Sequence, residues 1–191
     1  MFVLFGALQL SGELSGPGTY RLFALDAEWN APALFSGCLI LGASIAAFAL
    51  ADFNLETHTP PSLNRSFGLL LAYMALDEVF SLHERLEAWT GVDWQLLYLP
   101  LCALAAGIWL ALARCLRQFG SGYALLVWGV FSWAIAQVFE LVQWGGFNSD
   151  RIAHAWAVVP EEALEMVGST LFALSMLVAI RAAARLRLNS R

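Results

Sequence analysis

Long apolar runs separated by short polar segments follow one another from residue 31 to the C-terminus. A helix needs about 20 mostly apolar residues to cross the hydrocarbon core of a bilayer. The pattern therefore predicts an all-α membrane bundle of five transmembrane helices, at about residues 31–51, 62–89, 94–116, 123–144 and 160–186. Gly91 and Pro160 mark a helix end and a helix start, because glycine favours a C-terminal cap and proline a first turn.

The N-terminal residues 1–12 form a shorter apolar piece. This piece is too short to cross a bilayer and has no basic residues before it, so we predict that it lies at the membrane interface. The chain has no repeat and no change of composition that would mark a second domain. We therefore expect residues 1–191 to form a single transmembrane domain.

The composition supports this assignment and excludes one class of partner. Hydrophobic residues make up 60% of the chain and charged residues only 13%, whereas a soluble domain has roughly 25% charged residues. The formal net charge is −5, and lysine is absent. Without a basic patch to neutralise phosphates, a nucleic-acid partner is excluded, and the lipid bilayer is the expected surrounding.

Arginine is divided unequally between the two sides of the predicted bundle. Five spans place the chain ends on opposite sides, and the side of the C-terminus holds seven arginines against three on the other. Positively charged residues are enriched on the cytoplasmic side of membrane proteins. The sequence thus predicts a cytoplasmic C-terminus and an N-terminus outside.

Acidic residues interrupt the second, fourth and fifth predicted spans near their outer ends. Helical rise places them at similar depth, roughly 6–18 Å below the tryptophans of the outer interface. A charge near the middle of a bilayer costs about 2.5–3.5 kcal/mol, and the nearby Arg85 and Arg151 are too few to neutralise the whole group. The group comprises Asp77, Glu78, His83, Glu84, Glu140, Glu162 and Glu165.

These seven residues form an oxygen-rich set with one imidazole. Such a set suits iron, manganese or zinc, or calcium if His83 does not bind the ion. We therefore predict that the seven residues bind a divalent metal ion in a site open to the outside. A membrane metalloenzyme would also need an open coordination position and a path for its substrate, and the sequence leaves that question open.

Parts of the same acidic pattern are also compatible with roles that need no metal. Glu161 and Glu162 suit a first helical turn, where the helix dipole favours acids. A non-catalytic subunit of a larger membrane complex, or of a homo-oligomer, would use the polar cluster to fix how its helices pack. A proton or cation transporter would use it as a relay, although no charged residue links Asp77 with Asp52 at the inner boundary.

The joint pattern of polar residues resembles a group of small, uncharacterised bacterial multi-pass membrane proteins. The resemblance covers nearly the whole chain and implies a location in the bacterial inner membrane. It also implies that the predicted ligands work together with Glu28, and it brings no assigned activity. The residues that carry it are Leu25 to Asn30, Leu76-Asp77-Glu78, His83-Glu84-Arg85-Leu86, a Glu late in the fourth span, Glu161-Glu162 and Glu165-Met166-Val167-Gly168.

Overall fold

The structure, a computed structural model, describes residues 31–52, 59–146 and 151–189. The predicted interfacial segment 1–12 and Glu28 lie outside the described residues. The described part of the chain is entirely helical and contains no strand, which confirms the all-α prediction. Its helices are α3 (Ala31–Asp52), α4 (Pro61–Phe80), α5 (Leu82–Thr90), α6 (Trp94–Leu97), α7 (Leu99–Leu116), the 3-10 helix η1 (Arg117–Phe119), α8 (Ser121–Gly146) and α9 (Arg151–Asn189).

Four helical stretches in these ranges are long and apolar enough to cross a membrane. They are Ala33–Asp52, Leu99–Phe119, Ser121–Glu140 and Val158–Leu186. Large apolar side chains also point away from the rest of the bundle, including Ile45 on α3, Trp128 on α8 and Leu177 on α9. A soluble surface would be mostly polar along these faces, whereas lipid tails favour apolar side chains. The chain is a multi-pass membrane protein.

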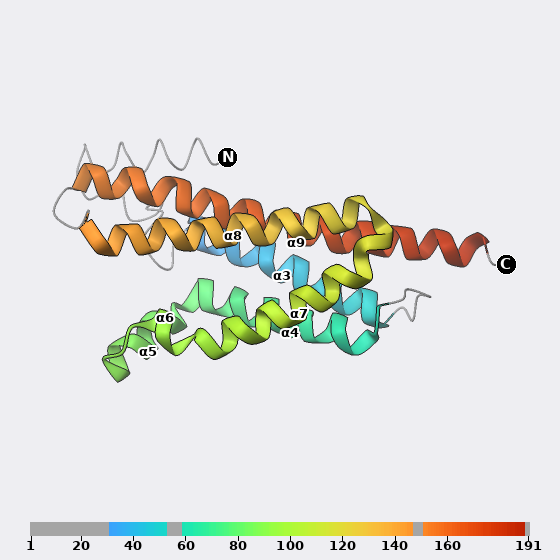
Figure 1. The fold of residues 1–191 in the computed structure, drawn as a ribbon, viewed down its shortest axis with the longest axis horizontal. Helices are drawn as coiled ribbons and strands as arrows, with labels where there is room; N and C mark the ends of the chain where they lie inside the picture. Colours follow the sequence, from blue (N-terminus) through green and yellow to red (C-terminus); the bar gives the residue numbers. More distant parts are fainter. Residues whose placement is uncertain (1–30, 53–58, 147–150, 190–191) are drawn as a thin grey trace.

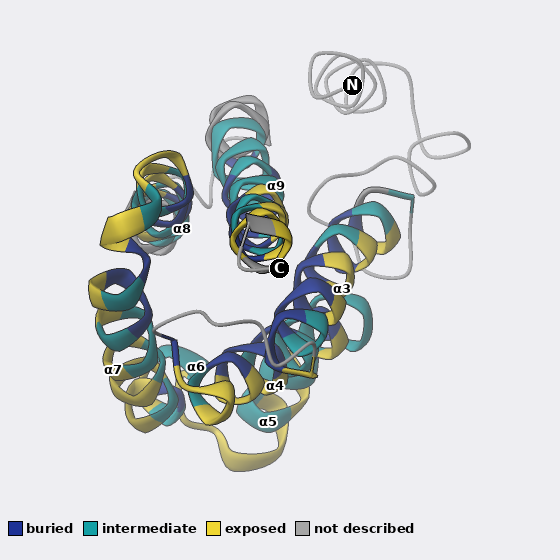
Figure 2. Cartoon of the chain, turned by 90° about the vertical axis from the view of Figure 1, so that its right-hand side faces the viewer, coloured by how far each residue is buried: buried dark blue, intermediate teal, exposed yellow. Residues whose placement is uncertain are grey.

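The helices form a curved row that closes into a ring when viewed along its length (Figure 2). Helix α9 packs against α8 on one side and against α3 on the other, and α4 packs against α3. Helix α7 follows α4 and is joined to α8 through η1 (Figure 1). This arrangement leaves α7 and α8 diverging from η1 toward the end of the bundle that carries α5 and α6 (Figure 1).

The buried core lies mainly toward the η1 end of the bundle. Helix α7 buries only Leu112, Ala113 and Leu116, all near its C-terminus. These side chains belong to one apolar cluster with buried residues from the four other long helices. No residue in the N-terminal half of α7 is buried in this cluster. The interior of the bundle is therefore tightly packed with side chains at the η1 end and less tightly packed at the other end.

Three predicted helices differ from the structure, two by a break inside them and one by an earlier start. The span predicted at 62–89 is broken at Ser81, whose φ of 46° and ψ of 53° end α4 and begin α5. The span predicted at 94–116 is broken at Tyr98, where Pro100 lies in the first turn of α7. The last helix begins at Arg151 rather than Pro160, and Pro160 lies inside it. The helices predicted at 31–51 and 123–144 agree with α3 and α8 to within two residues.

Helices α8 and α9 pack closely at two glycines, Gly129 and Gly168. A Cβ atom on Gly168 would lie 2.9 Å from the carbonyl oxygen of Gly129 and would also meet the indole of Trp133. The space around Gly107 on α7 is open, and a Cβ atom added there would meet nothing within 4 Å.

We expect Gly168→Ala to lower the free energy of unfolding by about 1–3 kcal/mol, because backbone and indole must move apart to admit the methyl group. Gly107→Ala is the matched control and should be neutral or slightly stabilising, since alanine favours the helix. Thermal unfolding of both variants in detergent measures the difference. Equal melting temperatures for the two variants would contradict the close α8–α9 contact.

Candidate functional site

A cavity of about 940 Å³ lies between α4, α7, α8 and α9, with α5 and α6 at one end. Apolar side chains such as Phe67, Leu71, Val130 and Phe172 line the part toward the core. The other end is lined by polar and acidic side chains. These are Tyr73, Asp77, Glu78, His83, Glu84, Glu87, Tyr98, Gln137, Glu140, Glu161, Glu162 and Glu165.

Three of the acids come together at the polar end. Glu78, Glu162 and Glu165 each offer an oxygen atom, and these atoms lie within 4.8 Å of one another. All three side chains are half-buried. We call these three residues the carboxylate triad.

Helix geometry explains why these residues meet. Glu162 and Glu165 are three residues apart on α9, which places them on one face. Glu78 is near the C-terminus of α4, and α4 approaches α9 where the rings of Phe67 and Phe172 meet edge to face at 5.9 Å. The two helices therefore place their acids on opposite walls of the same cavity.

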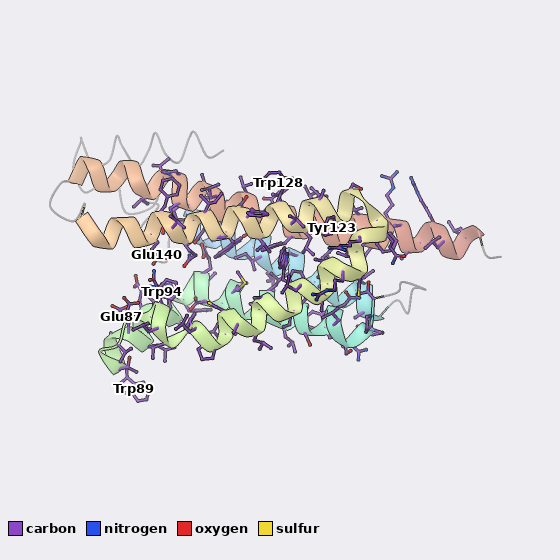
Figure 3. All side chains as sticks on the ribbon, in the orientation of Figure 1. Glu87, Trp89, Trp94, Tyr123, Trp128 and Glu140 are labelled. Carbon is purple, nitrogen blue, oxygen red and sulfur yellow. The ribbon has the colours of Figure 1, made fainter. Side chains whose placement is uncertain are left out.

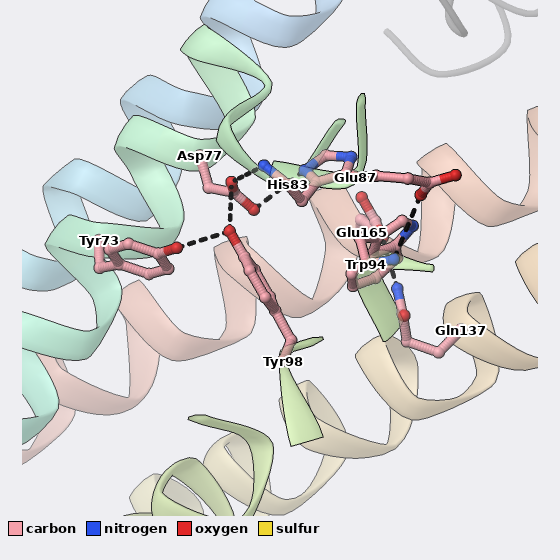
Figure 4. Close-up of polar contacts among 8 residues, drawn as sticks. All are labelled: Tyr73, Asp77, His83, Glu87, Trp94, Tyr98, Gln137 and Glu165. Carbon is pink, nitrogen blue, oxygen red and sulfur yellow. Dashed lines mark hydrogen bonds and ion pairs between the residues drawn. The ribbon is translucent and has the colours of Figure 1, made fainter. Parts of the chain in front are cut away.

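Hydrogen bonds from α8 and α9 hold Glu165 in position. The Gln137 amide donates to Oε1 of Glu165 at 3.3 Å. The Ser169 hydroxyl donates to the Glu165 carbonyl at 2.8 Å and accepts from the Trp133 indole at 3.3 Å. Glu165 is thus fixed by neighbours on both helices, and Figure 4 shows it beside Gln137.

Asp77 lies beside the triad but makes a different set of contacts. Its Oδ1 accepts hydrogen bonds from the His83 backbone N–H at 2.9 Å and from the Tyr98 hydroxyl at 3.0 Å. Its Oδ2 lies 3.1 Å from Nδ1 of His83. The Tyr98 hydroxyl also contacts that of Tyr73, so a chain of polar groups runs from α4 to the start of α7 (Figure 4).

The left-handed residue Ser81 makes this contact between Asp77 and His83 possible. On a continuous helix, residues six apart are turned about 240° from each other and cannot meet. The break at Ser81 turns α5 back, so that His83 reaches the carboxylate of Asp77. This conformation costs energy for a residue other than glycine.

Aromatic rings enclose the imidazole. The Trp94 ring lies 4.9 Å from the His83 ring, and the Tyr98 ring meets Trp94 edge to face at 5.6 Å. Tyr73, Trp94 and Tyr98 are not among the site residues that the sequence predicts. The spacing of Trp94 and Tyr98 by four is compatible with a shared face, but the contact of Trp94 with His83 depends on the break at Ser81.

The surroundings of His83 act on its pKa in opposite directions. Burial lowers the pKa, whereas the hydrogen bond and negative charge of Asp77, together with Glu84 and Glu140, raise it. The net effect raises the pKa above its ordinary value of 6.5.

Burial and the contact with Tyr73 raise the pKa of Tyr98, which therefore stays a neutral hydrogen-bond donor.

The seven predicted ligands thus separate into distinct groups. The triad unites Glu78, Glu162 and Glu165, while Asp77 and His83 bind each other. Glu140 lines the cavity from α8, close to Trp94 and Gln137 (Figure 3). The Glu84 side chain is exposed at the rim.

Comparison with known proteins places the chain in a family. The chain belongs to the family described as a domain of unknown function, DUF8692, which matches residues 1–180. No curated protein matches the chain, and no solved structure matches it. The predicted resemblance to an uncharacterised group without an assigned activity is confirmed.

We expect Asp77→Asn to lower the pKa of His83, because burial remains while the hydrogen bond to a charged partner is lost. A raised folded-state pKa means that this pair stabilises the fold fully below pH 6.5 and that the effect is lost as pH rises through the folded value. Imidazole NMR titration, with His58 and His154 replaced by Gln, measures the shift.

The control for this titration is Asp93→Asn, which removes an equal charge from an exposed residue that caps α6. The pKa of His83 should stay unchanged in that variant. An unchanged titration in Asp77→Asn would show that this carboxylate does not hold the imidazole proton.

Proposed function

We propose that this member of the DUF8692 family binds a divalent cation inside the membrane bundle through Glu78, Glu162 and Glu165. The observation that carries the proposal is the approach of three carboxylate oxygens from two helices to within 4.8 Å of one another. An oxygen ligand lies about 2.4 Å from a bound ion, so two oxygens on opposite sides of the ion are about 4.8 Å apart. Two oxygens at neighbouring coordination positions are closer together. The spacing is compatible with three ligands of one ion.

Electrostatics around the triad favours a bound cation. Glu165 is close enough to Glu78, Glu162, Glu161 and Glu140 to feel the negative charge of each. Removing several carboxylates from water into a low-dielectric layer is unfavourable unless opposite charge accompanies them. A divalent ion supplies that charge at the point where three of the carboxylates meet.

The ligand chemistry favours a hard ion over a soft one. His83 binds Asp77 through Nδ1 and lies against Trp94, which leaves the triad with oxygen ligands alone. Oxygen-only sites suit manganese or calcium better than zinc, for which imidazole and thiolate are frequent ligands. Three protein ligands would leave roughly half of the positions of a six-coordinate ion for water or substrate.

We further propose that α4 is a fifth membrane crossing and that the acidic end faces outward. Helix α4 has 20 residues and lies beside α3. The cavity end with the acids is formed where α4 and α8 end and where α7 and the span of α9 begin, as expected for alternating crossings. Arg114 and Arg117 lie at the other end, which would then face the cytoplasm of a bacterial inner membrane.

The metal proposal predicts that Glu162→Gln and Glu165→Gln each lose bound metal and melt at lower temperature, as should chelated wild type. A ligand present at 100 times its Kd stabilises the folded state by about 2.7 kcal/mol, so this much stability is lost with the ion. Elemental analysis of purified protein and thermal unfolding, both before and after chelation, measure the two effects.

Glu140→Gln is the matched control, because it removes a carboxylate from the same cavity but outside the triad. This variant should keep its metal. If the wild type contains no metal and the triad variants are equally or more stable, the acids serve helix packing in a larger assembly instead.

The orientation is tested in a protein whose three cysteines have been replaced. A cysteine at Thr90, the exposed last residue of α5, should react with a membrane-impermeant maleimide in intact cells. A cysteine at Gln118, exposed in η1, should react only after the cells are broken. The reverse labelling pattern would invert the proposed orientation.

A further inference from the structure

The cavity extends well beyond the carboxylate triad. Its apolar part is lined by Phe67, Leu71, Trp109, Val130 and Phe172. Along α9, Phe172 is seven residues from Glu165, a rise of about 10 Å. One metal ion occupies little of a volume of about 940 Å³, which is large enough for an organic ligand.

The charged side chains that line the cavity are acidic, apart from the imidazole of His83. Among the described residues that line the cavity, no arginine occurs, and its imidazole is bound to Asp77. After a divalent ion has offset two charges of the triad, Glu140 and Glu161 still line the same end of the cavity. This end therefore favours a cationic group over an anionic or neutral one.

Aromatic rings line the acidic end of the cavity. They are Trp94, the first residue of α6, and Tyr98, just before α7, and Glu140 faces Trp94 from α8 (Figure 3). Ammonium groups are attracted to the faces of such rings in addition to the attraction of nearby carboxylates.

We infer that the cavity binds a single-chain amphiphile with an ammonium head. The head lies beside the carboxylate of Glu140 and the ring of Trp94, and the hydrocarbon tail lies along Trp109, Val130 and Phe172. The tail enters from the bilayer between α7 and α8, because Cys102 and Ala106 on α7 and Ala134 on α8 line the cavity and are also exposed. This inference goes beyond the metal site and does not require a bound ion.

The test measures binding of three probes to the full chain by native mass spectrometry from a neutral detergent, with and without chelator. Dodecyltrimethylammonium has both the tail and the cationic head and should give a one-to-one complex. Tetramethylammonium lacks the tail and dodecyl sulfate carries the opposite charge, so both should bind at least about tenfold more weakly. Equal retention of dodecyl sulfate would overturn the inference.

Two alanines on α7 provide a matched pair of variants. Both are exposed, but Ala106 lines the cavity and Ala103 does not. Ala106→Trp should fill the cavity and weaken dodecyltrimethylammonium binding by about tenfold or more, while Ala103→Trp should bind like the wild type. If the two variants bind alike, the ligand lies on the outer surface and the inference is wrong.

Two measurements keep this result separate from the metal proposal. The metal content of Ala106→Trp should equal that of the wild type, since Ala106 is not in the triad. If Ala106→Trp does not fold, Ala134→Trp on α8 fills the same cavity, with Ile135→Trp as its exposed control. Glu140→Gln should weaken binding of the ammonium probe and leave the metal in place.

Discussion

Mutual repulsion of carboxylates in a layer of low dielectric constant is the constraint on which this structure depends. Glu78 and Glu165 come from different helices, yet their oxygens share one small volume with Glu162. Such a cluster forms only if the packing elsewhere holds the helices together against repulsion. The close contact of Gly129 with Gly168, less than one turn from Glu165, and the apolar cluster around Leu112 and Phe172 provide that packing.

The amino-acid sequence predicts the helices well and their interruptions poorly. Hydropathy over 20 residues is a strong signal, so the predicted bounds of α3 and α8 agree with the structure to within two residues. The break at Ser81 depends on tertiary contacts, because nothing in the local sequence requires a left-handed serine. The break at Tyr98 agrees with Pro100, a local signal that the hydropathy of the span does not reveal. Pro160 suggests a helix start, but a proline inside a membrane helix is tolerated where neighbouring groups compensate for the lost hydrogen bond.

The same difference applies to the candidate site. Depth along each helix follows from the rise per residue, and it correctly brings acids from α4, α8 and α9 to one cavity. The rotation of each helix and the turn after α4 do not follow from it. They decide which acids lie together in the triad and which bind a histidine. Asp77 and Glu78 are neighbours in sequence, yet the first binds His83 and the second lies in the triad.

Helix α7 is held differently at its two ends, by buried apolar side chains near η1 and by the contacts of Tyr98 with Asp77 and Tyr73 at its start. Its 18 residues extend about 27 Å from η1, and only its last turns are buried. Gly120, with φ of 31°, follows η1 directly. A rotation of about 5° at η1 would displace the far end of the helix by about 2 Å, given that length. The width of the cavity near Trp94 is therefore set jointly by η1 at one end of α7 and by the contacts of Tyr98 with Asp77 and Tyr73 at the other.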